Sequence, residues 1–320
     1  MNGSETPLIC ILLATYEPRL DWLRELLLSL NGQTYPNLFL RVRDDGSARP
    51  TFEAVCTLIG STVTAFPYAI ERNETNLGSN RTFELLTAEG SGAYFAYCDQ
   101  DDLWLPEKLS VLAEILDRTG AGLACSDVIP VDEGGKPLAN SITEIRPRHV
   151  FRCGVGLAPE LVYRNFVMGC TMLIRGDIAK AALPFAQNMV HDHYLAFYTA
   201  REHGIEVAPR PLVQYRLHEG NQTGVLVRVH TKEEYLTLYL QPFCRRVAEL
   251  RDRFPEDVPE EAARWADARV ANAAHRAGGF RALFALRRVN RAATLFELLA
   301  LRFPEPLFRL VVGLIQRGKL

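Results

Sequence analysis

The chain has 320 residues, of which 48% are hydrophobic and 23% are charged, which is ordinary for a soluble globular protein. Its length suggests at most two domains, and no window offers the roughly 20 apolar residues that a membrane-spanning helix needs. The formal net charge of −2 gives no general case for nucleic-acid binding.

The N-terminal part alternates apolar runs of strand length with segments of helical periodicity. We predict strands at residues 8–14, 38–42, 69–72, 94–98 and 122–126. We predict helices between them at residues 20–30, 51–59, 81–88 and 107–118. The first apolar run is only seven residues long and has no basic flank, which favours a buried strand over a signal peptide. This alternation predicts an α/β fold with a parallel-type sheet and right-handed crossovers.

The pattern is less regular beyond residue 126. The glycines and prolines of residues 130–156 predict a loop, with a hairpin turn at 133–135. Further strands are predicted at residues 166–175, 207–211 and 213–216, and a helix begins at the polar group 191–194 and extends to 200. Helices are predicted at residues 231–254, 260–275 and 280–320, the last with a break at Pro304 and Pro306. We therefore expect an α/β domain over residues 1–225 and a helical region over 226–320.

Three carboxylates follow the predicted strand at residues 94–98, at Asp99, Asp101 and Asp102. Like charges this close repel one another unless solvent or a cation relieves them. At the carboxyl end of a strand in an α/β sheet, the arrangement suggests a divalent cation in a ligand crevice. A solvated acidic turn explains these residues equally well.

Five motifs, in this order, resemble those of the family 2 glycosyltransferases. They are ATYEPR at 14–19, RDDGS at 43–47, NLGSNRTFE at 76–84, CDQDDLWLPEKL at 98–109, and HDHY at 191–194 with YRLHEGN at 215–221. Each is weak alone, and the resemblance rests on their order and spacing over about residues 7–221. It implies a GT-A nucleotide-sugar-binding fold, with the helical region following it. It also implies an inverting, metal-dependent transfer from a nucleoside-diphosphate sugar to a glycan or lipid-linked acceptor.

The resemblance suggests which residues bind the nucleotide sugar: Thr15, Tyr16, Asp44, Asn80, Arg81, Asp99, Asp101 and Trp104. Tyr16 could stack on the nucleobase, with ordinary packing as the alternative. Asp44 could accept a hydrogen bond from a pyrimidine ring, and Asp45 could instead cap or stiffen the Gly46-Ser47 turn, with turn chemistry as the alternative for both residues.

The remaining donor residues each have a second explanation. Asn80 and Arg81 could meet the diphosphate at a helix start, although a solvated arginine is the alternative. Asp99 could hold the ribose or order its loop. Trp104 could wall the sugar pocket or be a core tryptophan.

The resemblance also suggests metal ligands and a general base. Mg²⁺ or Mn²⁺ would be held by Asp102 first, then Asp101, and His218 could join them or be a lone surface histidine. Asp192 is the expected base, a role compatible with capping the following helix. His191 and His193 flank it, and either could instead donate to the acceptor.

Two motifs, CDQDDLWLPEKL and YRLHEGN, most resemble rhamnosyltransferase-like members that build bacterial surface polysaccharides such as O-antigen or capsule. This favours dTDP-L-rhamnose as donor, although UDP-hexoses fit the same residues. A catalytically silent glycan- or partner-binding module on the same fold is the alternative. A sugar nucleotidyltransferase would need a glycine-rich loop after the first strand, and no glycine lies between Gly3 and Gly32. A prenyl-chain synthase would carry its aspartate clusters on helices.

The C-terminal helices are basic, because residues 264–320 hold eleven Arg or Lys and three Asp or Glu. Residues 307–315 with Arg309, Arg317 and Lys319 read as amphipathic and basic. Peripheral contact with an anionic membrane is one interpretation, and packing against the catalytic domain or another subunit is the other. The seven cysteines lack CxxC spacing, which favours reduced cysteines in a cytoplasmic protein.

Overall fold

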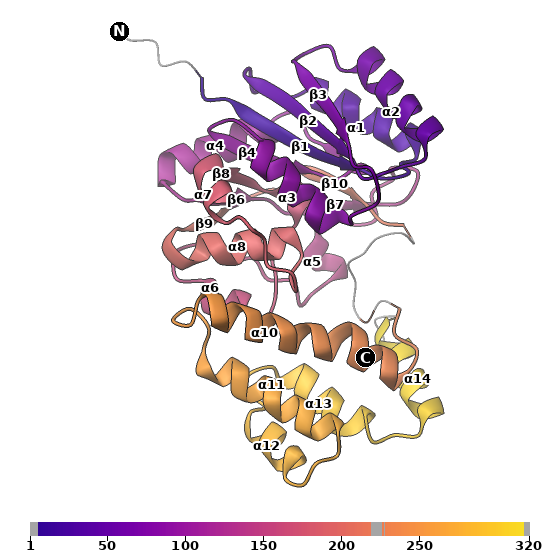
Figure 1. The fold of residues 1–320 in the computed structure, drawn as a ribbon, viewed down its shortest axis with the longest axis vertical. Coiled ribbons are helices and arrows are strands. Elements are labelled where there is room, and N and C mark those ends of the chain that lie inside the picture. The colour runs from indigo at the N-terminus through magenta and orange to yellow at the C-terminus, as the bar shows by residue number, and fades with distance from the viewer. Residues whose placement is uncertain (1–5, 219–225, 227, 317–320) are drawn as a thin grey trace. The chain divides into compact units, whose positions relative to one another are not determined.

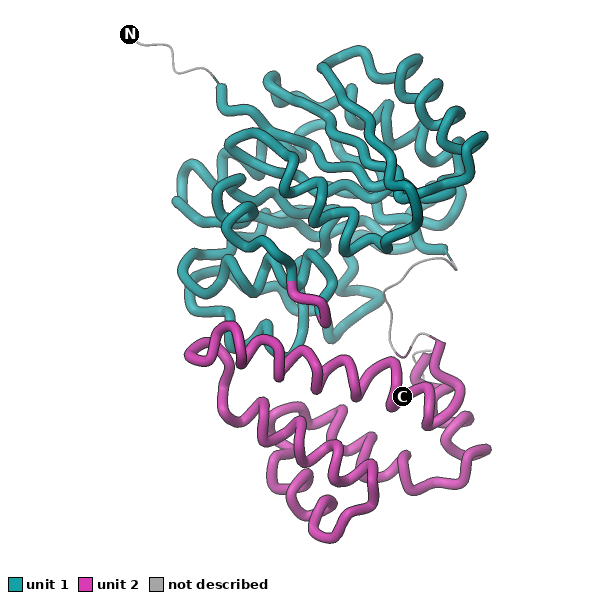
Figure 2. Tube along the Cα trace, in the orientation of Figure 1, with its two compact units in different colours: residues 1–185, 189–218 teal, residues 186–188, 219–320 magenta. Residues whose placement is uncertain are grey.

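A computed structural model of the chain describes residues 6–218, 226 and 228–316. The chain divides into two compact units, which we describe separately (Figure 2). The first unit comprises Met1–Phe185 and Met189–His218, and the second comprises Ala186–Asn188 and Glu219–Leu320. The boundary predicted at residue 225 lies outside the described residues, as do Arg317 and Lys319.

The first unit is built on a seven-stranded sheet of order β3-β2-β1-β4-β8-β6-β9, with helices on both faces (Figure 1). Its strands are β1 (Ile9–Thr15), β2 (Leu38–Asp44), β3 (Tyr68–Arg72), β4 (Tyr94–Cys98), β6 (Leu123–Cys125), β8 (Leu173–Arg175) and β9 (Ile205–Val207). Only β8 runs antiparallel to its neighbours in this sheet. The predicted α/β fold with a mostly parallel sheet is confirmed.

The helices of this unit are amphipathic where the sequence predicts it. The longer ones are α1 (Leu20–Asn31), α2 (Arg49–Thr62), α3 (Ser79–Glu89), α4 (Lys108–Thr119) and α8 (His191–Glu202). The shorter ones are α5 (Ile142–Ile145), α6 (Ala158–Leu161) and α7 (Gly176–Ala181). In α1, four fully buried leucines recur at helical spacing: Leu23, Leu26, Leu27 and Leu30. Each contributes roughly 1.5–3 kcal/mol by leaving water for the core.

A second, three-stranded sheet has the order β5-β10-β7. It consists of β5 (Leu103–Trp104), β10 (Val213–Arg216) and β7 (Val128–Val131). Val213 pairs with Trp104, and Gln214 pairs with Leu103. Because β5 directly follows the acidic turn, this pairing brings the end of β10 next to that turn.

Two predicted strands are largely wrong. Within residues 166–175 only β8 is a strand, and the 3-10 helix η1 (Gly169–Thr171) precedes it, because the backbone there bonds to side chains of other elements. Over 207–211 only Val207 belongs to a strand, β9; Pro209 and Pro211 lack the N–H that a ladder needs. The predicted hairpin turn is confirmed by an antiparallel bridge between Val131 and Pro137.

The described secondary structure of the second unit consists of helices, joined by turns and irregular segments. Its helices are α9 (Lys232–Tyr235), the π-helix η2 (Leu236–Leu240), α10 (Gln241–Arg253), α11 (Glu260–Ala273), α12 (Gly279–Ala285), α13 (Arg291–Ala300) and α14 (Glu305–Gln316). Its core contains a buried ion pair of 2.5 Å between Arg269 and Glu297. Among the described residues, no helix is long and apolar enough to cross a membrane.

Candidate functional site

Strands β1, β2 and β4 run parallel and end at the same edge of the large sheet. Thr15, the last residue of β1, pairs in register with Asp44, the last residue of β2. The acidic turn begins at Asp99, directly after β4. Because ligands of open α/β sheets bind at the carboxyl ends of the strands, this edge is the candidate site.

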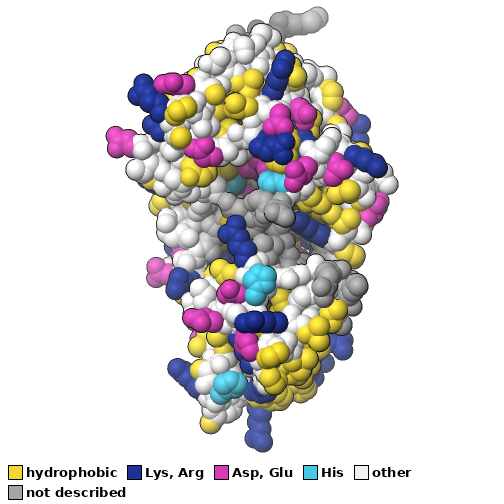
Figure 3. Space-filling view, turned by 90° about the vertical axis from the view of Figure 1, so that its right-hand side faces the viewer, with side chains coloured by type: hydrophobic (Ala, Val, Ile, Leu, Met, Phe, Trp, Pro, Cys, Tyr) yellow, Lys and Arg dark blue, Asp and Glu magenta, His cyan; other side chains and the backbone are white. Residues whose placement is uncertain are grey.

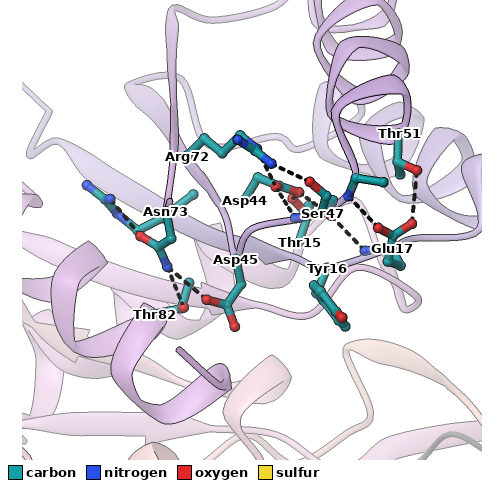
Figure 4. Close-up of polar contacts among 12 residues, drawn as sticks. Thr15, Tyr16, Glu17, Asp44, Asp45, Ser47, Thr51, Arg72, Asn73 and Thr82 are labelled. Carbon is teal, nitrogen blue, oxygen red and sulfur yellow. Dashed lines mark hydrogen bonds and ion pairs between the residues drawn. The ribbon is translucent and has the colours of Figure 1, made fainter. Parts of the chain in front are cut away.

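The carboxylate of Asp44 organises the loops at this edge. It is completely buried and accepts hydrogen bonds from the Thr15 hydroxyl (3.0 Å), the Ser47 hydroxyl (2.7 Å) and the Ser47 N–H (2.8 Å) (Figure 4). Gly46 has a φ of +80°, and a Cβ there would lie 2.5 Å from the backbone of Thr75. Asp44 therefore stabilises the turn that follows β2, and its contact with a nucleobase stays a prediction.

Asp45 has a different role from the one predicted. Its carboxylate accepts hydrogen bonds from the Asn73 side chain and from the N–H groups of Leu77 and Gly78, each at 2.8 Å. The prediction that Asp45 stiffens the Gly46-Ser47 turn is therefore wrong, because that turn is capped by Asp44 and Asp45 instead orders the loop before α3.

Tyr16 lies just beyond β1 with 48% of its surface exposed, and its ring points away from the Asp44 network (Figure 4). Gln100 in the acidic turn fixes its backbone. The Tyr16 N–H donates to the Gln100 side-chain oxygen (2.8 Å), and the Gln100 amide donates to the Tyr16 carbonyl (3.2 Å). Gln100 was not predicted as a site residue, although its place in the acidic motif is a signal that could have found it.

The acidic turn contains a group of possible cation ligands. Asp99, Asp102 and Cys170 each place one oxygen or sulfur atom within 4.8 Å of the others. Asp102 is 1% exposed; its Oδ1 accepts from the Arg216 N–H (3.0 Å), while its buried Oδ2 accepts from no N–H or O–H of the described residues, and the neighbouring Cys170 thiol is only a weak donor to this carboxylate. A buried oxygen left in this state is costly, and a hard cation would satisfy it. The two carboxylates therefore fit a hard divalent metal, whereas the thiol of Cys170, whose pKa is raised well above its usual range by burial, is a poor ligand for one.

The predicted metal ligands lie in two separate groups. Asp102 lies with Asp99, whereas Asp101 accepts or shares a hydrogen bond of 2.8 Å with the Nε2 of His218. The His218 ring lies 5.1 Å from the Trp22 ring, so it is packed within the site rather than isolated on the surface. The last three residues of YRLHEGN, at 219–221, lie outside the described residues.

Burial dominates the electrostatics of the acidic turn. It raises the pKa of Asp99 to about 7, with further repulsion from Asp101 and Asp192. Burial also raises the pKa of Asp102 well above its usual range, and the neighbouring Asp101 and Asp99 add to this. These carboxyls therefore hold protons more readily than free ones.

Lys108, the first residue of α4, was missed by the sequence analysis. It is completely buried, its ammonium donates to the Cys170 carbonyl (2.6 Å), and it lies 3.0 Å from the centre of the Trp104 ring. Burial lowers the pKa of Lys108 to about 7. Its position four residues before the buried Leu112 could have marked it as a core-facing lysine. Trp104 is 3% exposed and packs in the core, in line with the second of its two predicted roles.

Asp192 lies in the first turn of α8, and its carboxylate is held from two sides. Its Oδ2 accepts from the Gly169 N–H (3.0 Å), and its Oδ1 accepts from the Asn165 side chain (3.2 Å) and the His193 N–H (2.5 Å). Burial raises the pKa of Asp192 to about 6. The predicted helix-capping role is wrong, because Val190 occupies the N-cap position.

The histidines beside Asp192 are buried. His191 stacks on Phe83 with the ring centres 4.0 Å apart, and burial lowers the pKa of His191 to about 3. The Nε2 of His193 lies 2.5 Å from the Leu161 carbonyl. A Cβ at Gly169 would lie 2.9 Å from His191 Nε2, so a larger residue there would push the buried His191 ring away from its position.

Asn80 and Arg81 lie in the first turn of α3, as predicted. Arg81 is half exposed and forms an ion pair with Glu84 one turn later. The second oxygen of Glu84 accepts from the Phe185 N–H (2.9 Å). The arginine is therefore held by its own helix in this state.

Arg216 in β10 forms hydrogen bonds that connect the acidic turn to neighbouring segments. This role of Arg216 was not predicted from the sequence. Its side chain is 1% exposed and donates to the carbonyls of Asp101 (3.0 Å) and Glu133 (2.6 Å) and to the carboxylate of Glu25 (2.6 Å). Together with the hydrogen bond from the Arg216 N–H to Asp102, these side-chain bonds fix the acidic turn against β10.

Comparisons with known proteins agree with this geometry. The Glycosyl transferase family 2 model matches residues 10–176, more than half of the chain. An uncharacterized glycosyltransferase of Rickettsia typhi is 25% identical over 249 residues, which cover 74% of this chain and 72% of that protein. The dTDP-rhamnosyl transferase RfbG of Shigella flexneri is 24% identical over 162 residues, which cover 48% of this chain and 53% of that protein.

Two solved structures share the fold. S. aureus TarS in complex with UDP-GlcNAc has a TM-score of 0.58 and 15% identity, covering 97% of this chain and 92% of that chain. The mannosyltransferase PcManGT of Pyrobaculum calidifontis, in complex with GDP-Man and Mn²⁺, has a TM-score of 0.53 and 16% identity, covering 98% and 87%. At these identities the likeness concerns the fold alone, and it confirms the predicted GT-A type.

Proposed function

The chain belongs to glycosyl transferase family 2 and is a glycosyltransferase with a nucleotide-sugar donor, and on this premise we propose a specific reaction for it. The enzyme moves a sugar with inversion, with the help of a divalent metal, to a glycan or lipid-linked acceptor of a bacterial surface polysaccharide. The preferred donor is dTDP-L-rhamnose, and a UDP-hexose is the second choice. The likeness to the Shigella flexneri dTDP-rhamnosyl transferase supports the first.

One observation carries the proposal: the buried Oδ2 of Asp102, left without an N–H or O–H donor beside Asp99 and Cys170. We assign Asp102 as the first metal ligand, with Asp99 close enough to share the ion. The hydrogen-bonded pair of Asp101 and His218 supplies the next candidates. Mg²⁺ or Mn²⁺, when bound, would neutralise the charge that grows on the leaving nucleoside diphosphate.

Asp192 acts as the general base in this proposal. An ordinary aspartate with a pKa of about 3.9 is a weak base for a hydroxyl. Because burial raises the pKa of Asp192 to about 6, it is a stronger base and is still ionised at neutral pH. It takes the acceptor's proton as the acceptor oxygen bonds to the anomeric carbon and the diphosphate leaves from the opposite face. The Gly169 N–H and the Asn165 amide orient the carboxylate for this transfer.

The donor's nucleotide lies at the ends of β1 and β2 in this proposal. Tyr16 offers a half-exposed ring for stacking on the base, and Gln100 holds its backbone in place. Thr15 and Asp44 order the loop beneath it. Asn80 and Arg81 reach the diphosphate once Arg81 exchanges Glu84 for phosphate. The basic second unit contacts an anionic membrane, on the cytoplasmic side, where lipid-linked acceptors are available.

Calorimetric titration with dTDP and with UDP, each with and without Mn²⁺, tests the donor site. We expect Mn²⁺-dependent binding, tighter for dTDP, followed by turnover of dTDP-L-rhamnose in the presence of an acceptor. Tighter binding of UDP would reassign the donor to a UDP-hexose. Nucleotide binding with no turnover of any donor would favour a silent binding module, and no binding under any metal condition would overturn the proposal.

A further inference from the structure

The second unit contains a cavity of about 350 Å³ that the transfer reaction does not use. Its lining residues are His275, Arg276, Gly278, Phe280, Arg281 and Arg302. They come from the α11–α12 connection, from α12 and from the residues that follow α13. Half of the lining residues are arginines.

No carboxylate neutralises these arginines among the described residues. Arg276 and Arg281 make no side-chain hydrogen bond or ion pair there, and Arg302 bonds only to the Leu298 carbonyl (3.0 Å) and the face of Phe280 (4.8 Å). The two acids nearest to Arg302 in sequence are engaged elsewhere, and the acid nearest to Arg276, Asp267, is exposed on α11 and forms no ion pair with it among the described residues. Glu297 is completely buried against Arg269, and Glu305 accepts from the Lys232 N–H (3.0 Å). The cavity is therefore positively charged and lacks an internal counter-ion.

Three guanidinium groups around one cavity favour an anion with several oxygens. Each guanidinium can donate two parallel hydrogen bonds to a phosphate, and its charge is weakly hydrated compared with an ammonium group. The repulsion between the three cations falls when such an anion enters. The cavity is large enough for a phosphate group with a substituent attached.

Exposed apolar side chains accompany the arginines. Phe280 and Phe284 are each 45% exposed and lie parallel, with ring centres 6.5 Å apart, and Arg287 covers Phe284 at 4.5 Å. Leu299, one turn before Arg302, is 57% exposed. In the lower part of Figure 3, which shows one face of the second unit, hydrophobic side chains gather with Lys and Arg beside them. A small soluble phosphate needs no such apolar surface, whereas a phospholipid presents acyl chains next to its phosphate.

We propose that this cavity binds the phosphate group of an anionic membrane phospholipid, with Phe280 and Phe284 entering the headgroup–acyl boundary. Arg276, Arg281 and Arg302 hold the phosphate. This inference rests on the proposed function in one respect: lipid binding would bring the enzyme to a membrane that carries the acceptor. Its chemistry depends on the second unit alone.

Vesicle flotation of the full chain tests the proposal, with phosphatidylcholine vesicles that contain or lack phosphatidylglycerol. We expect binding only with phosphatidylglycerol, and a loss of roughly a hundredfold in the Arg276→Gln/Arg281→Gln/Arg302→Gln variant, given the usual contribution of each arginine near an anionic surface. The matched control replaces three exposed arginines of α10 and α11 in the same unit, Arg245, Arg251 and Arg264, by Gln. It loses the same charge, and we expect it to lose less than about threefold.

A second arm separates a lipid from a free phosphate. Phe280→Ser/Phe284→Ser should weaken vesicle binding, and calorimetry with inorganic phosphate should show no tight site. Equal losses in the two arginine variants, tight binding of inorganic phosphate, or preference for a single-stranded oligonucleotide over the vesicles would each overturn the lipid site. Calorimetric binding of dTDP in the same variants should be unchanged, so a failure here is distinguishable from a failure of the transferase proposal.

Discussion

The ammonium of Lys108 donates a hydrogen bond of 2.6 Å to the carbonyl of Cys170. The residue before Cys170 is Gly169, whose N–H holds the carboxylate of Asp192 at 3.0 Å. The Sγ of Cys170 also belongs to the group formed with Asp99 and Asp102. The 3-10 helix η1 thus connects the candidate metal ligands with the candidate base, and Lys108 fixes it from inside the core.

Lys108→Met should therefore lower both stability and transfer. The variant leaves the buried Cys170 carbonyl unpaired, which costs about 1–3 kcal/mol, and it removes a positive charge beneath the acidic turn. We expect a lower Tm in thermal unfolding and a fall of roughly tenfold or more in kcat/KM, because η1 no longer holds Asp192 as firmly. Lys136→Met, at an exposed position, is the control for loss of a lysine. Unchanged Tm and kcat/KM in Lys108→Met would show that the contact has no role.

Asp192→Asn should retain donor binding and lose transfer. The amide keeps one acceptor oxygen, which can serve either the Gly169 N–H or the Asn165 and His193 donors, so part of the local hydrogen bonding should persist, but the amide cannot accept a proton. General base catalysis is worth roughly 10²–10⁴-fold, which sets the expected fall in kcat. Nucleotide titration by calorimetry and single-turnover transfer assays measure the two effects separately. Transfer at the wild-type rate would remove Asp192 as the base.

The pH dependence of transfer should follow Asp192. Since its pKa is raised to about 6, the fraction of ionised base, and with it kcat, should fall as the pH drops through about 6. Asn165→Leu removes a hydrogen bond that favours the ionised carboxylate, so its profile should move to higher pH. The raised pKa of Asp192 also affects the stability of the fold. As the pH rises above about 3.9, the unfolded state releases this proton before the folded state does, so Asp192 lowers the free energy of unfolding. A profile in Asn165→Leu identical to that of the wild type would contradict this assignment.

The central part of the fold could be predicted because its strands β1 and β4 are almost entirely apolar. Residues 9–13 are completely buried and residues 94–98 are completely or nearly completely buried, and nothing in their sequence competes with a strand. The prediction of a strand at residues 166–175 was mostly wrong, because tertiary contacts determine the conformation of that segment. The Gly169 N–H and the Cys170 carbonyl bond to Asp192 and Lys108, which are distant in sequence. Apolar content alone does not reveal such contacts.

The sequence predicted the acidic turn, but it did not predict that the carboxylates of this turn have different partners. Neighbouring carboxylates in a turn point in different directions: Asp102 joins Asp99 and Asp101 joins His218. The different roles of Asp44 and Asp45 have the same cause. Only the register of β2 decides which of these two carboxylates faces the Ser47 turn. Lys108 and Arg216 were missed because buried cations stand out only once the groups around them are known.

Asp102→Asn and Asp101→Asn should differ in metal dependence. Asp102 has the buried oxygen without an N–H or O–H donor, whereas Asp101 already has His218 as a partner. We expect Asp102→Asn to abolish the Mn²⁺-dependent part of dTDP binding, and Asp101→Asn to weaken it by roughly tenfold or less. Calorimetric titrations at several Mn²⁺ concentrations resolve the two. If Asp101→Asn has the larger effect, the metal lies on the Asp101–His218 side.

Gln100→Leu should weaken donor binding more than it slows the chemical step. Its amide makes two hydrogen bonds to the backbone of Tyr16, and both are lost while the tyrosine ring is kept. Each bond contributes about 0.5–1.5 kcal/mol to holding the loop, so we expect the KM for the donor to rise by roughly tenfold with little change in kcat. Tyr16→Phe is the matched control: it keeps the backbone bonds and the stacking face, and its KM should remain close to that of the wild type. A Tyr16→Ala variant that binds the donor normally would show that the ring does not stack on the nucleobase, and an unchanged KM in Gln100→Leu would show that the loop is held without this clamp.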